Sequence, residues 1–432
     1  MGKIIIFGLG FVGITLAIFL ASKNQNVIGV DIDKKKIQVL KKGISPIYEP
    51  RIEHALKKAL MKRLVFTNKI EKISKDDIVF VTVGTPSKKD GSIDLKFIKS
   101  VSKKIVELIK NMSDLPLVVI KSTILPGTFE DTIKPIFIKN SISSKNIVIN
   151  PEFLREGSAL EDTLHPHQIV IGGERKTAKT LEKFYRKIYS NKVPIEISNH
   201  TTAELIKYAN NSFLATKISF INSIANLCQT LPGTNIDQIA RSIGRDPRIG
   251  SLFLNAGPGY GGSCFPKDVK ALISLIKKRH LGSDLLISVH KTNLNQVKIV
   301  LRLISKYVKP LKNSSISILG LAFKENSDDI RESVSIKLIK KLLENHVKVK
   351  VHDPKAMKNV EKVFGKKITY YKHPKDCLKN SNCAIILTSW KQYFSLSNKE
   401  FSKMKTPILI DTRRILAGKK INVKYIGLGI GE

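Results

Sequence analysis

The sequence contains little cysteine and few acidic residues. Its 432 residues include four cysteines and one tryptophan, and 36 Asp and Glu stand against 74 Lys and Arg. The cysteines form no CxxC pair and no spacing typical of zinc ligands, which argues against a disulfide framework and against a structural metal. We therefore expect no bound metal and a location in a reducing compartment, the cytoplasm. If one cysteine has a function there, we expect that function to depend on the reactivity of its thiol.

Arginine is scarce as well. It supplies 13 of the 74 basic residues, although the net charge of +38 by itself suggests nucleic acid, an anionic membrane or an acidic small molecule as partner. The planar guanidinium group of arginine forms two hydrogen bonds at once to a base edge or to a phosphate. Lysine, by contrast, is a solvated point charge. The scattered lysines therefore favour a solvated surface first, attraction of an anionic ligand second and nucleic acid last.

No uninterrupted apolar run is long enough to cross a membrane. Residues 4–21 are almost wholly apolar and resemble a signal peptide or a short span. Three glycines interrupt this segment, and a second strand-like run follows it at 26–30. Since buried parallel strands also read as continuous apolar runs, we interpret the segment as a first strand–helix unit and expect no membrane partner.

Strand-like and helical segments alternate in two blocks of the chain, which predicts doubly wound parallel sheets. The strand-like runs are 3–8, 27–30, 78–83, 117–121, 147–149 and 169–172, then 316–320, 347–352, 383–388 and 408–411. Between the blocks, residues 201–231 lack Gly and Pro and predict a helix of about 45 Å. The expected fold class is α/β, with two Rossmann-like doubly wound domains joined by a long central helix. The expected domains are 1–198, 199–308 and 309–432.

A glycine motif follows the first strand-like run. Gly8, Gly10 and Gly13 form a GxGxxG pattern at a strand-to-helix junction, and Asp31 ends the second run. The glycines permit a tight turn, close approach of a pyrophosphate and helix packing, while the carboxylate accepts both ribose hydroxyls of NAD. Asp31 repels a 2′-phosphate, although the lysines at 34–36 soften that preference. NAD is therefore the expected cofactor rather than NADP.

Polar loops follow three further strand-like runs. The segments 83–86 (VGTP) and 121–123 (KST) each end a run, where ligands of open α/β sheets bind, although such residues also form ordinary turns. The segment 150–157 (NPEFLREG) carries Glu152 and Glu156 four residues apart. On a helical turn these carboxylates share a face and can activate and position water, and a solvated surface helix is the alternative.

The long helix carries Lys207 and Asn211 four residues apart, on the face that also holds Glu204. A lysine and an amide on one face can stabilise an oxyanion. The alternative is an exposed ion pair between Lys207 and Glu204.

The segment 257–268, GPGYGGSCFPKD, is the most informative in the chain. Its four glycines let the backbone wrap closely around a bulky ligand. Cys264 follows them directly, and Lys267 and Asp268 come one turn later. Because a thiol near a cation is more readily the thiolate, we favour Cys264 as a nucleophile over a buried structural thiol.

Taken together, these motifs resemble those of the nucleotide-sugar dehydrogenases, the UDP-glucose/GDP-mannose dehydrogenase family. The resemblance covers nearly the whole chain and rests on GLGFVG, GTPS, KSTILPG, NPEFLREGSA, AELIKYANNSFLATKISFINSIANLC, GPGYGGSCFPKD and GLAFKENSDDIRES. It implies oxidation of a sugar C6 alcohol to the carboxylate by two NAD, through a thiohemiacetal and a thioester on Cys264. NPEFLREG favours UDP-glucose over a UDP-N-acetylhexosamine or GDP-mannose. A non-catalytic nucleotide-binding protein is the alternative of another class.

The resemblance also implies roles for individual residues. The implied catalytic residues are Cys264, Lys207, Asn211, Asp268, Glu152 and Thr123. The implied NAD contacts are Gly8, Gly10, Val12, Gly13, Asp31, Lys36, Thr85, Thr123, Glu156, Lys267 and Arg331. The implied UDP-sugar contacts are Phe153, Leu154, Glu156, Lys207, Asn211, Arg248, Gly257, Tyr260, Gly261, Lys324 and Arg414. The central helix is expected to form a homodimer or higher oligomer, with Arg248 reaching the partner's ligand. Asn255 departs from relatives that carry Lys there.

Overall fold

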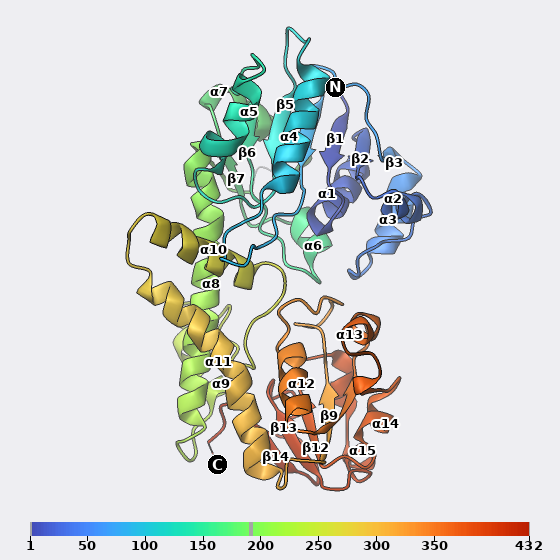
Figure 1. Ribbon diagram of the computed structural model, residues 1–432, viewed down its shortest axis with the longest axis vertical. Coiled ribbons are helices and arrows are strands. Elements are labelled where there is room, and N and C mark those ends of the chain that lie inside the picture. Colours follow the sequence, from blue (N-terminus) through green and yellow to red (C-terminus); the bar gives the residue numbers. More distant parts are fainter. Residues whose placement is uncertain (1, 190–192, 432) are drawn as a thin grey trace. The chain divides into compact units, whose positions relative to one another are not determined.

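The computed structural model describes residues 2–189 and 193–431. The described residues fall into two compact units, one up to Asn210 and one from Asn211 onward. Each unit contains one β-sheet with helices packed on it (Figure 1). The predicted division into three domains stays a prediction.

In the N-terminal unit, eight described strands form one sheet in the order β3-β2-β1-β4-β5-β6-β7-β8. All neighbours pair in parallel except β6 and β7, which are antiparallel. The strands are β1 Ile4–Phe7, β2 Val27–Val30, β3 Leu64–Thr67, β4 Ile78–Val81, β5 Leu117–Ile120, β6 Ile147–Ile149, β7 Ile169–Gly172 and β8 Ile195–Ser198. The helical segments are α1 Phe11–Ser22, α2 Lys34–Lys41, α3 Ile52–Leu60, α4 Lys96–Ile109, the π-helical turn η1 Phe129–Ile133, α5 Lys134–Ile138, α6 Ala159–Leu164 and α7 Arg175–Ile188.

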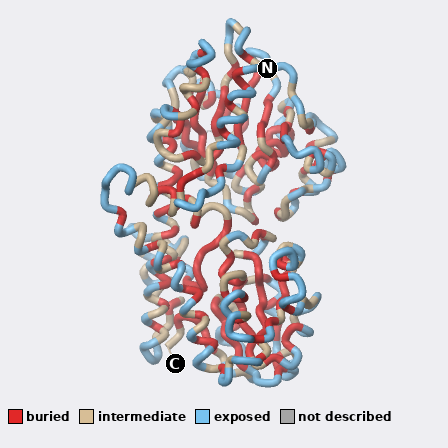
Figure 2. Tube along the Cα trace, in the orientation of Figure 1, coloured by how far each residue is buried: buried red, intermediate tan, exposed pale blue. Residues whose placement is uncertain are grey.

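Both faces of the inner strands of this sheet are buried, and Figure 2 shows these strands in red. Side chains alternate across each strand, so Ile6 of β1 packs with α1, α3 and α7, while Ile5 packs with α4 and α5. This two-sided burial explains why the strands read as continuous apolar runs in the sequence.

In the C-terminal unit, six described strands form a wholly parallel sheet in the order β11-β10-β9-β12-β13-β14. The strands are β9 Ser315–Leu319, β10 Lys348–His352, β11 Thr369–Tyr370, β12 Cys383–Ile386, β13 Ile408–Asp411 and β14 Lys424–Gly427. The helical segments are α9 Ile236–Gly244, α10 Phe265–Lys278, α11 Asp284–Tyr307, α12 Val334–Glu344, α13 Met357–Phe364, η2 Gly365–Lys367, α14 Pro374–Leu378, η3 Lys391–Ser395 and α15 Asn398–Phe401.

The central helix is α8, His200–Cys228, which begins in the first unit and continues into the second. Its length of 29 residues without Gly or Pro matches the prediction from the sequence. The fold class, two parallel α/β sheets and a long helix, is therefore confirmed. Among the described residues, no helix combines the length and apolarity that a membrane span needs.

The sequence prediction was incomplete in one respect and wrong in another. It missed β3, β8, β11 and β14, which lie at or near the outer ends of the two sheets. It also expected a helical turn at 150–157, whereas this segment is a loop and turn that precede α6. Glu152 and Glu156 therefore do not share a helical face.

Candidate active site

The glycine motif lies where β1 meets α1. Gly8 has φ +96°, and a Cβ on Gly13 would lie 1.9 Å from the Gly8 carbonyl oxygen, so both positions require glycine. No side chain caps the first turn of α1, and no acidic residue lies in it. Its backbone N–H groups are therefore free to bind a pyrophosphate, and the motif fits NAD.

Asp31 lies at the end of β2, directly beside this turn. Its Oδ2 accepts hydrogen bonds from Leu9 N at 2.9 Å and Lys36 Nζ at 2.7 Å, and its Oδ1 accepts one from Asp33 N. Burial alone would raise the pKa of Asp31, but these bonds outweigh it and hold the pKa below its ordinary value. The carboxylate is ionised at neutral pH, as the interpretation of NAD ribose binding requires.

The loops after β4 and β5 are hydrogen-bonded to each other at the carboxyl ends of these strands. Thr85 Oγ1 donates to the carbonyl oxygen of Thr123 at 2.7 Å, and Ser122 Oγ donates to that of Val83 at 2.7 Å. The strand order reverses between β1 and β4, and ligands of doubly wound sheets bind at such a switch point. The two predicted threonines are thus brought together beside the cofactor turn.

Glu152, in the loop after β6, forms a buried ion pair with Lys207 of α8. Glu152 Oε1 lies 3.3 Å from Lys207 Nζ, and Glu152 Oε2 accepts from Leu154 N at 2.5 Å. Lys207 Nζ also lies 5.1 Å from the centroid of the Phe153 ring. Two predicted site residues, Glu152 and Phe153, therefore lie against the ammonium group of a third, Lys207.

Glu204 has a different role from the one considered in the sequence. The alternative of an exposed pair with Lys207 is wrong, because both side chains are buried. Glu204 instead accepts hydrogen bonds from Gly127 N at 2.7 Å and Phe129 N at 2.9 Å. Burial raises the pKa of Glu204 to about 7, against those two hydrogen bonds. Glu204 thus fastens the loop that follows Thr123.

In the C-terminal unit, Cys264 precedes α10. Of the four cysteines, all of which the structure describes, only Cys264 is not buried. Burial raises the pKa of the Cys377 and Cys383 thiols to about 12, so neither is an available nucleophile. Cys264 is the N-cap residue of the 14-residue α10, at the end of the helix where the dipole favours negative charge.

Asp268 lies one turn into α10 and is almost fully buried. Its Oδ2 accepts from Asn211 Nδ2 at 2.6 Å, and its Oδ1 lies 2.6 Å from Lys267 Nζ. The predicted residues Asn211, Lys267 and Asp268 thus form one hydrogen-bonded group beside the cysteine. Lys207 and Asn211, one turn apart on α8, each contact a buried carboxylate.

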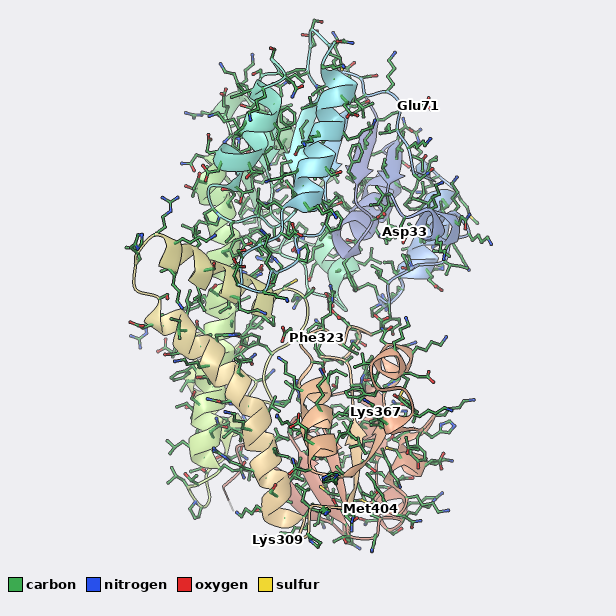
Figure 3. The ribbon with its side chains drawn as sticks, in the orientation of Figure 1. Asp33, Glu71, Lys309, Phe323, Lys367 and Met404 are labelled. Atoms are coloured by element: carbon green, nitrogen blue, oxygen red, sulfur yellow. The ribbon has the colours of Figure 1, made fainter. Side chains whose placement is uncertain are left out.

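The glycine loop before Cys264 is held by close backbone packing. Asn293 of α11 clamps Tyr260, accepting from its N–H at 2.8 Å and donating to its carbonyl at 3.0 Å. A Cβ on Gly262 would lie 2.7 Å from the ring of Phe323, which Figure 3 labels on the loop after β9. The Tyr260 side chain is buried against Phe265.

Four further residues predicted to contact a ligand, three arginines and one lysine, each contact another side chain of the protein. Arg331 pairs with Asp329 at 2.7 Å, and exposed Arg248 pairs with Asp246 at 2.6 Å. Lys324 Nζ lies 5.9 Å from the Phe323 ring centroid. Buried Arg414 donates to the Asp237 carboxylate and to the carbonyls of Ala256 and Leu428, which holds it within the fold. The ligand roles of these four residues stay predictions.

The sequence reasoning missed several residues of the site. Lys121 and Asn150 follow β5 and β6, Asn293 holds the glycine loop, and partly buried Arg413 lies against Gly257. Lys121 stood inside the quoted KST segment, and Arg413 stood next to Arg414. Position directly after a strand was the available signal for Lys121 and Asn150, whereas Arg413 lies two residues after β13 and Asn293 offered no signal.

The fold and the cofactor turn define an NAD-dependent dehydrogenase. The chain belongs to the UDP-glucose/GDP-mannose dehydrogenase family: the NAD binding domain matches residues 2–192, the central domain 201–295 and the UDP binding domain 317–418. The cofactor is therefore NAD.

Individual relatives cover the chain over its full length. The UDP-glucose 6-dehydrogenase of Rickettsia conorii is 41% identical, covering 99% of both chains, and that of Rhizobium meliloti is 38% identical with the same coverage. A UDP-glucose dehydrogenase from Pyrobaculum islandicum is 34% identical with a TM-score of 0.92, covering 100% of this chain and 98% of its own. A UDP-D-ManNAc dehydrogenase from Pyrococcus horikoshii is 26% identical with a TM-score of 0.85, covering 99% of both chains.

Proposed function

We propose that this chain oxidises UDP-glucose at C6 to UDP-glucuronate. One alcohol, two NAD⁺ and one water give one carboxylate, two NADH and three protons. The proposal is supported by full-length curated relatives that carry the name UDP-glucose 6-dehydrogenase at about 40% identity. It draws further support from the NPEFLREG loop, which favours UDP-glucose.

Cys264 carries the covalent chemistry in this proposal. NAD, held by the turn at Gly8–Gly13 and by Asp31, would supply the hydride acceptor for both oxidations at C6. A water held by Asp268 and Thr123 takes the proton of the C6 alcohol in the first. The Cys264 thiolate then attacks the aldehyde carbon to give a thiohemiacetal, and its oxidation leaves a thioester. The aldehyde stays attached to the enzyme between the two oxidations.

Hydrolysis of the thioester needs a positioned water and a stabilised oxyanion. Glu152 or Asp268 positions the water that attacks the thioester carbon, and the Cys264 thiolate leaves. Lys207 and Asn211 stabilise the negative oxygen of the tetrahedral intermediates. One such donor is worth about 2.7–4 kcal/mol of transition-state stabilisation. The supporting observation is that Cys264 is the one unburied cysteine, beside a group in which Asn211 contacts Asp268.

The test compares Cys264→Ser with the same substitution at the buried Cys228 as a matched control. Wild type and C228S are expected to form two NADH per UDP-glucose consumed, whereas C264S forms no carboxylate and still binds NAD. A ratio of one NADH per sugar in the wild type contradicts the double oxidation. Unchanged turnover in C264S contradicts the covalent step.

The substrate is tested separately, because a dehydrogenase of UDP-N-acetylhexosamine or of GDP-mannose would use the same chemistry. UDP-GlcNAc, UDP-ManNAc and GDP-mannose are assayed beside UDP-glucose for NADH formation. Brisk turnover of one of them with none of UDP-glucose overturns the assignment of substrate. Binding of all four nucleotide sugars without formation of NADH would favour a non-catalytic nucleotide-binding protein.

We also propose a homodimer through α8 and a cytoplasmic location. Phe213, Phe220 and Leu227 lie seven residues apart on α8, and each is more than half exposed. Seven residues correspond to about two helical turns, so the three side chains form one apolar stripe. Such a stripe supports packing against a second copy of the chain.

A further inference from the structure

Glu49 lies in the loop between α2 and α3, and its carboxylate is buried against a distant segment of the same unit. Its Oε2 accepts a hydrogen bond from Gly157 N at 2.8 Å, and its Oε1 accepts one from Ala159 N at 2.6 Å. These donors stand 108 and 110 residues further along the chain. A carboxylate that uses both oxygens in this way fixes the direction as well as the position of the backbone it holds.

The backbone held by Glu49 is the end of the NPEFLREG loop and the start of α6. Within the described part of the chain, the side chain of Ser158, the N-cap residue of α6, forms no capping hydrogen bond. The first N–H groups of a helix need acceptors from outside the helix, and an N-cap serine is their usual source. Gly157 has φ +78°, so the chain turns sharply just before the helix. The place of this turn is therefore set by Glu49 and not by a local cap.

The beginning of the NPEFLREG loop is held in a similar way. Asn150 Nδ2 donates to the Val170 carbonyl at 2.7 Å, and Asn150 Oδ1 accepts from Tyr185 OH at 2.5 Å. The loop is thus fastened at both ends by groups from other segments, with Glu152 between them. Of the two fastenings, the one at Glu49 comes from the side of the cofactor helix.

This second fastening ties the loop to α1, the helix that begins at the glycine motif. The backbone carbonyl of Glu49 accepts from the N–H of Ile52, the first residue of α3, at 3.2 Å. Both α3 and α6 pack on α1, and Val12 of α1 lines one small cavity together with Phe153 and Leu154 of the loop. Glu49 therefore joins two helices that share α1 as their support, and the loop lies between α6 and the cofactor turn.

We propose that Glu49 is a positioning residue: its carboxylate fixes the NPEFLREG loop, so that Glu152 and Phe153 meet the nucleotide sugar in a productive arrangement. The inference rests on the proposed function, in which Glu152 positions water and Phe153 contacts the substrate. Glu49 acts through its two bonds to the loop backbone and does not itself touch the substrate.

The experiment breaks this contact from either end. Glu49→Gln keeps one acceptor oxygen and places an amide N–H against a backbone donor. Ala159→Pro removes a donor from the loop side and leaves the carboxylate intact, at the first helical position, where proline is tolerated. Since small displacements of reacting groups are costly, each variant is expected to lower kcat/KM for UDP-glucose by about 10- to 100-fold. Part of that loss should appear in kcat, because Glu152 moves with the loop.

The double variant tests whether both changes act through one contact. If they do, E49Q/A159P is no slower than the slower single variant, whereas losses that multiply in full overturn the inference. Asp77→Asn is the matched control: this buried carboxylate accepts from Lys3 N at 2.7 Å and Ser74 N at 2.8 Å, at the amino ends of β1 and β4. D77N should lower the midpoint of urea unfolding much as E49Q does, with kcat and KM as in wild type.

A purely structural Glu49 would give another result. Wild-type kinetics in E49Q or in A159P overturns the inference, and so does a kcat/KM in D77N that falls as far as in E49Q. If circular dichroism shows that one of the two loop variants is unfolded, the other decides.

Failure of the proposed function gives a different pattern. If another nucleotide sugar is turned over in place of UDP-glucose, the proposed substrate alone is refuted, and the variants are compared with that sugar. If wild type binds UDP-glucose without forming NADH, the proposed oxidation alone is refuted. The dissociation constant of UDP-glucose, expected to rise about tenfold in E49Q and to stay unchanged in D77N, then decides the inference.

Discussion

Lys36 Nζ lies 2.7 Å from Asp31 Oδ2, so the carboxylate expected to bind the NAD ribose already holds a cation. Lys36 is partly buried on α2, and Asp31 is pinned from its other side by the Leu9 N–H. The pair places both a repulsive and an attractive group for a 2′-phosphate at the end of β2. Cofactor preference therefore depends on which of the two charges dominates.

We predict that Asp31→Asn weakens the preference for NAD over NADP. The substitution removes the repulsion of a 2′-phosphate and leaves Lys36 without its carboxylate, so the ratio of kcat/KM values should shift by about 10- to 100-fold toward NADP. Initial rates with each cofactor measure the shift. Adding Lys36→Ala to this variant should cancel the gain with NADP, and an unchanged ratio in D31N would contradict the prediction.

A second prediction concerns Glu204 and the pH dependence of stability. Its pKa is about 7 in the folded protein, above the ordinary value of 4.5, so the folded state binds more protons than the unfolded state between these values. The free energy of unfolding therefore falls as pH rises from 4.5 through 7, by about 3 kcal/mol from this group alone. In Glu204→Gln this decline should be absent.

Urea unfolding of both proteins between about pH 5 and about pH 8 checks this difference. Exposed Glu107, substituted by Gln, serves as the control and should keep the wild-type slope. Parallel pH curves for wild type and E204Q would show that Glu204 is ionised throughout and would refute the prediction.

A third prediction concerns the clamp on the glycine loop. Asn293→Ala removes both hydrogen bonds to the backbone of Tyr260, leaving a buried N–H and a buried carbonyl unpaired. We expect a loss of about 1–3 kcal/mol in stability and a lower kcat/KM for the sugar nucleotide. The dissociation constant for NAD, measured by fluorescence titration, should stay unchanged because neither Asn293 nor Tyr260 is among the predicted NAD contacts. Asn295→Ala, exposed on the same helix, is the matched control.

The sequence predicted those features whose determining contacts lie within one short segment of the chain. The GxGxxG turn was recognisable because Gly8 and Gly13 meet their steric constraint within a few residues of one another. The inner strands were recognisable because both their faces are buried. By contrast, β8 (IEIS) and β14 (KYIG) lie at sheet ends, are short and mix polar with apolar residues, so they carried no clear pattern.

The parts that escaped prediction depend on long-range contacts. Lys121 contacts Asn150 across 29 residues, and Glu204 contacts Phe129 across 75. The spacing of Glu152 and Glu156 suggested a helical turn, but Glu152 turns toward Lys207 from a loop. No pattern within one segment encodes such partners, because each is set by the order of strands in the sheet.

A final prediction tests the apolar stripe on α8. Phe220 is 54% exposed in the single chain, between the more exposed Phe213 and equally exposed Leu227. If a second copy packs there, Phe220→Asp buries a charge in the interface and should convert a dimer to a monomer in sedimentation velocity. Met61→Asp, at an exposed apolar residue directly after α3, is the control and should leave the dimer intact. A wild-type monomer, or an F220D dimer of wild-type affinity, would place the interface elsewhere or exclude it.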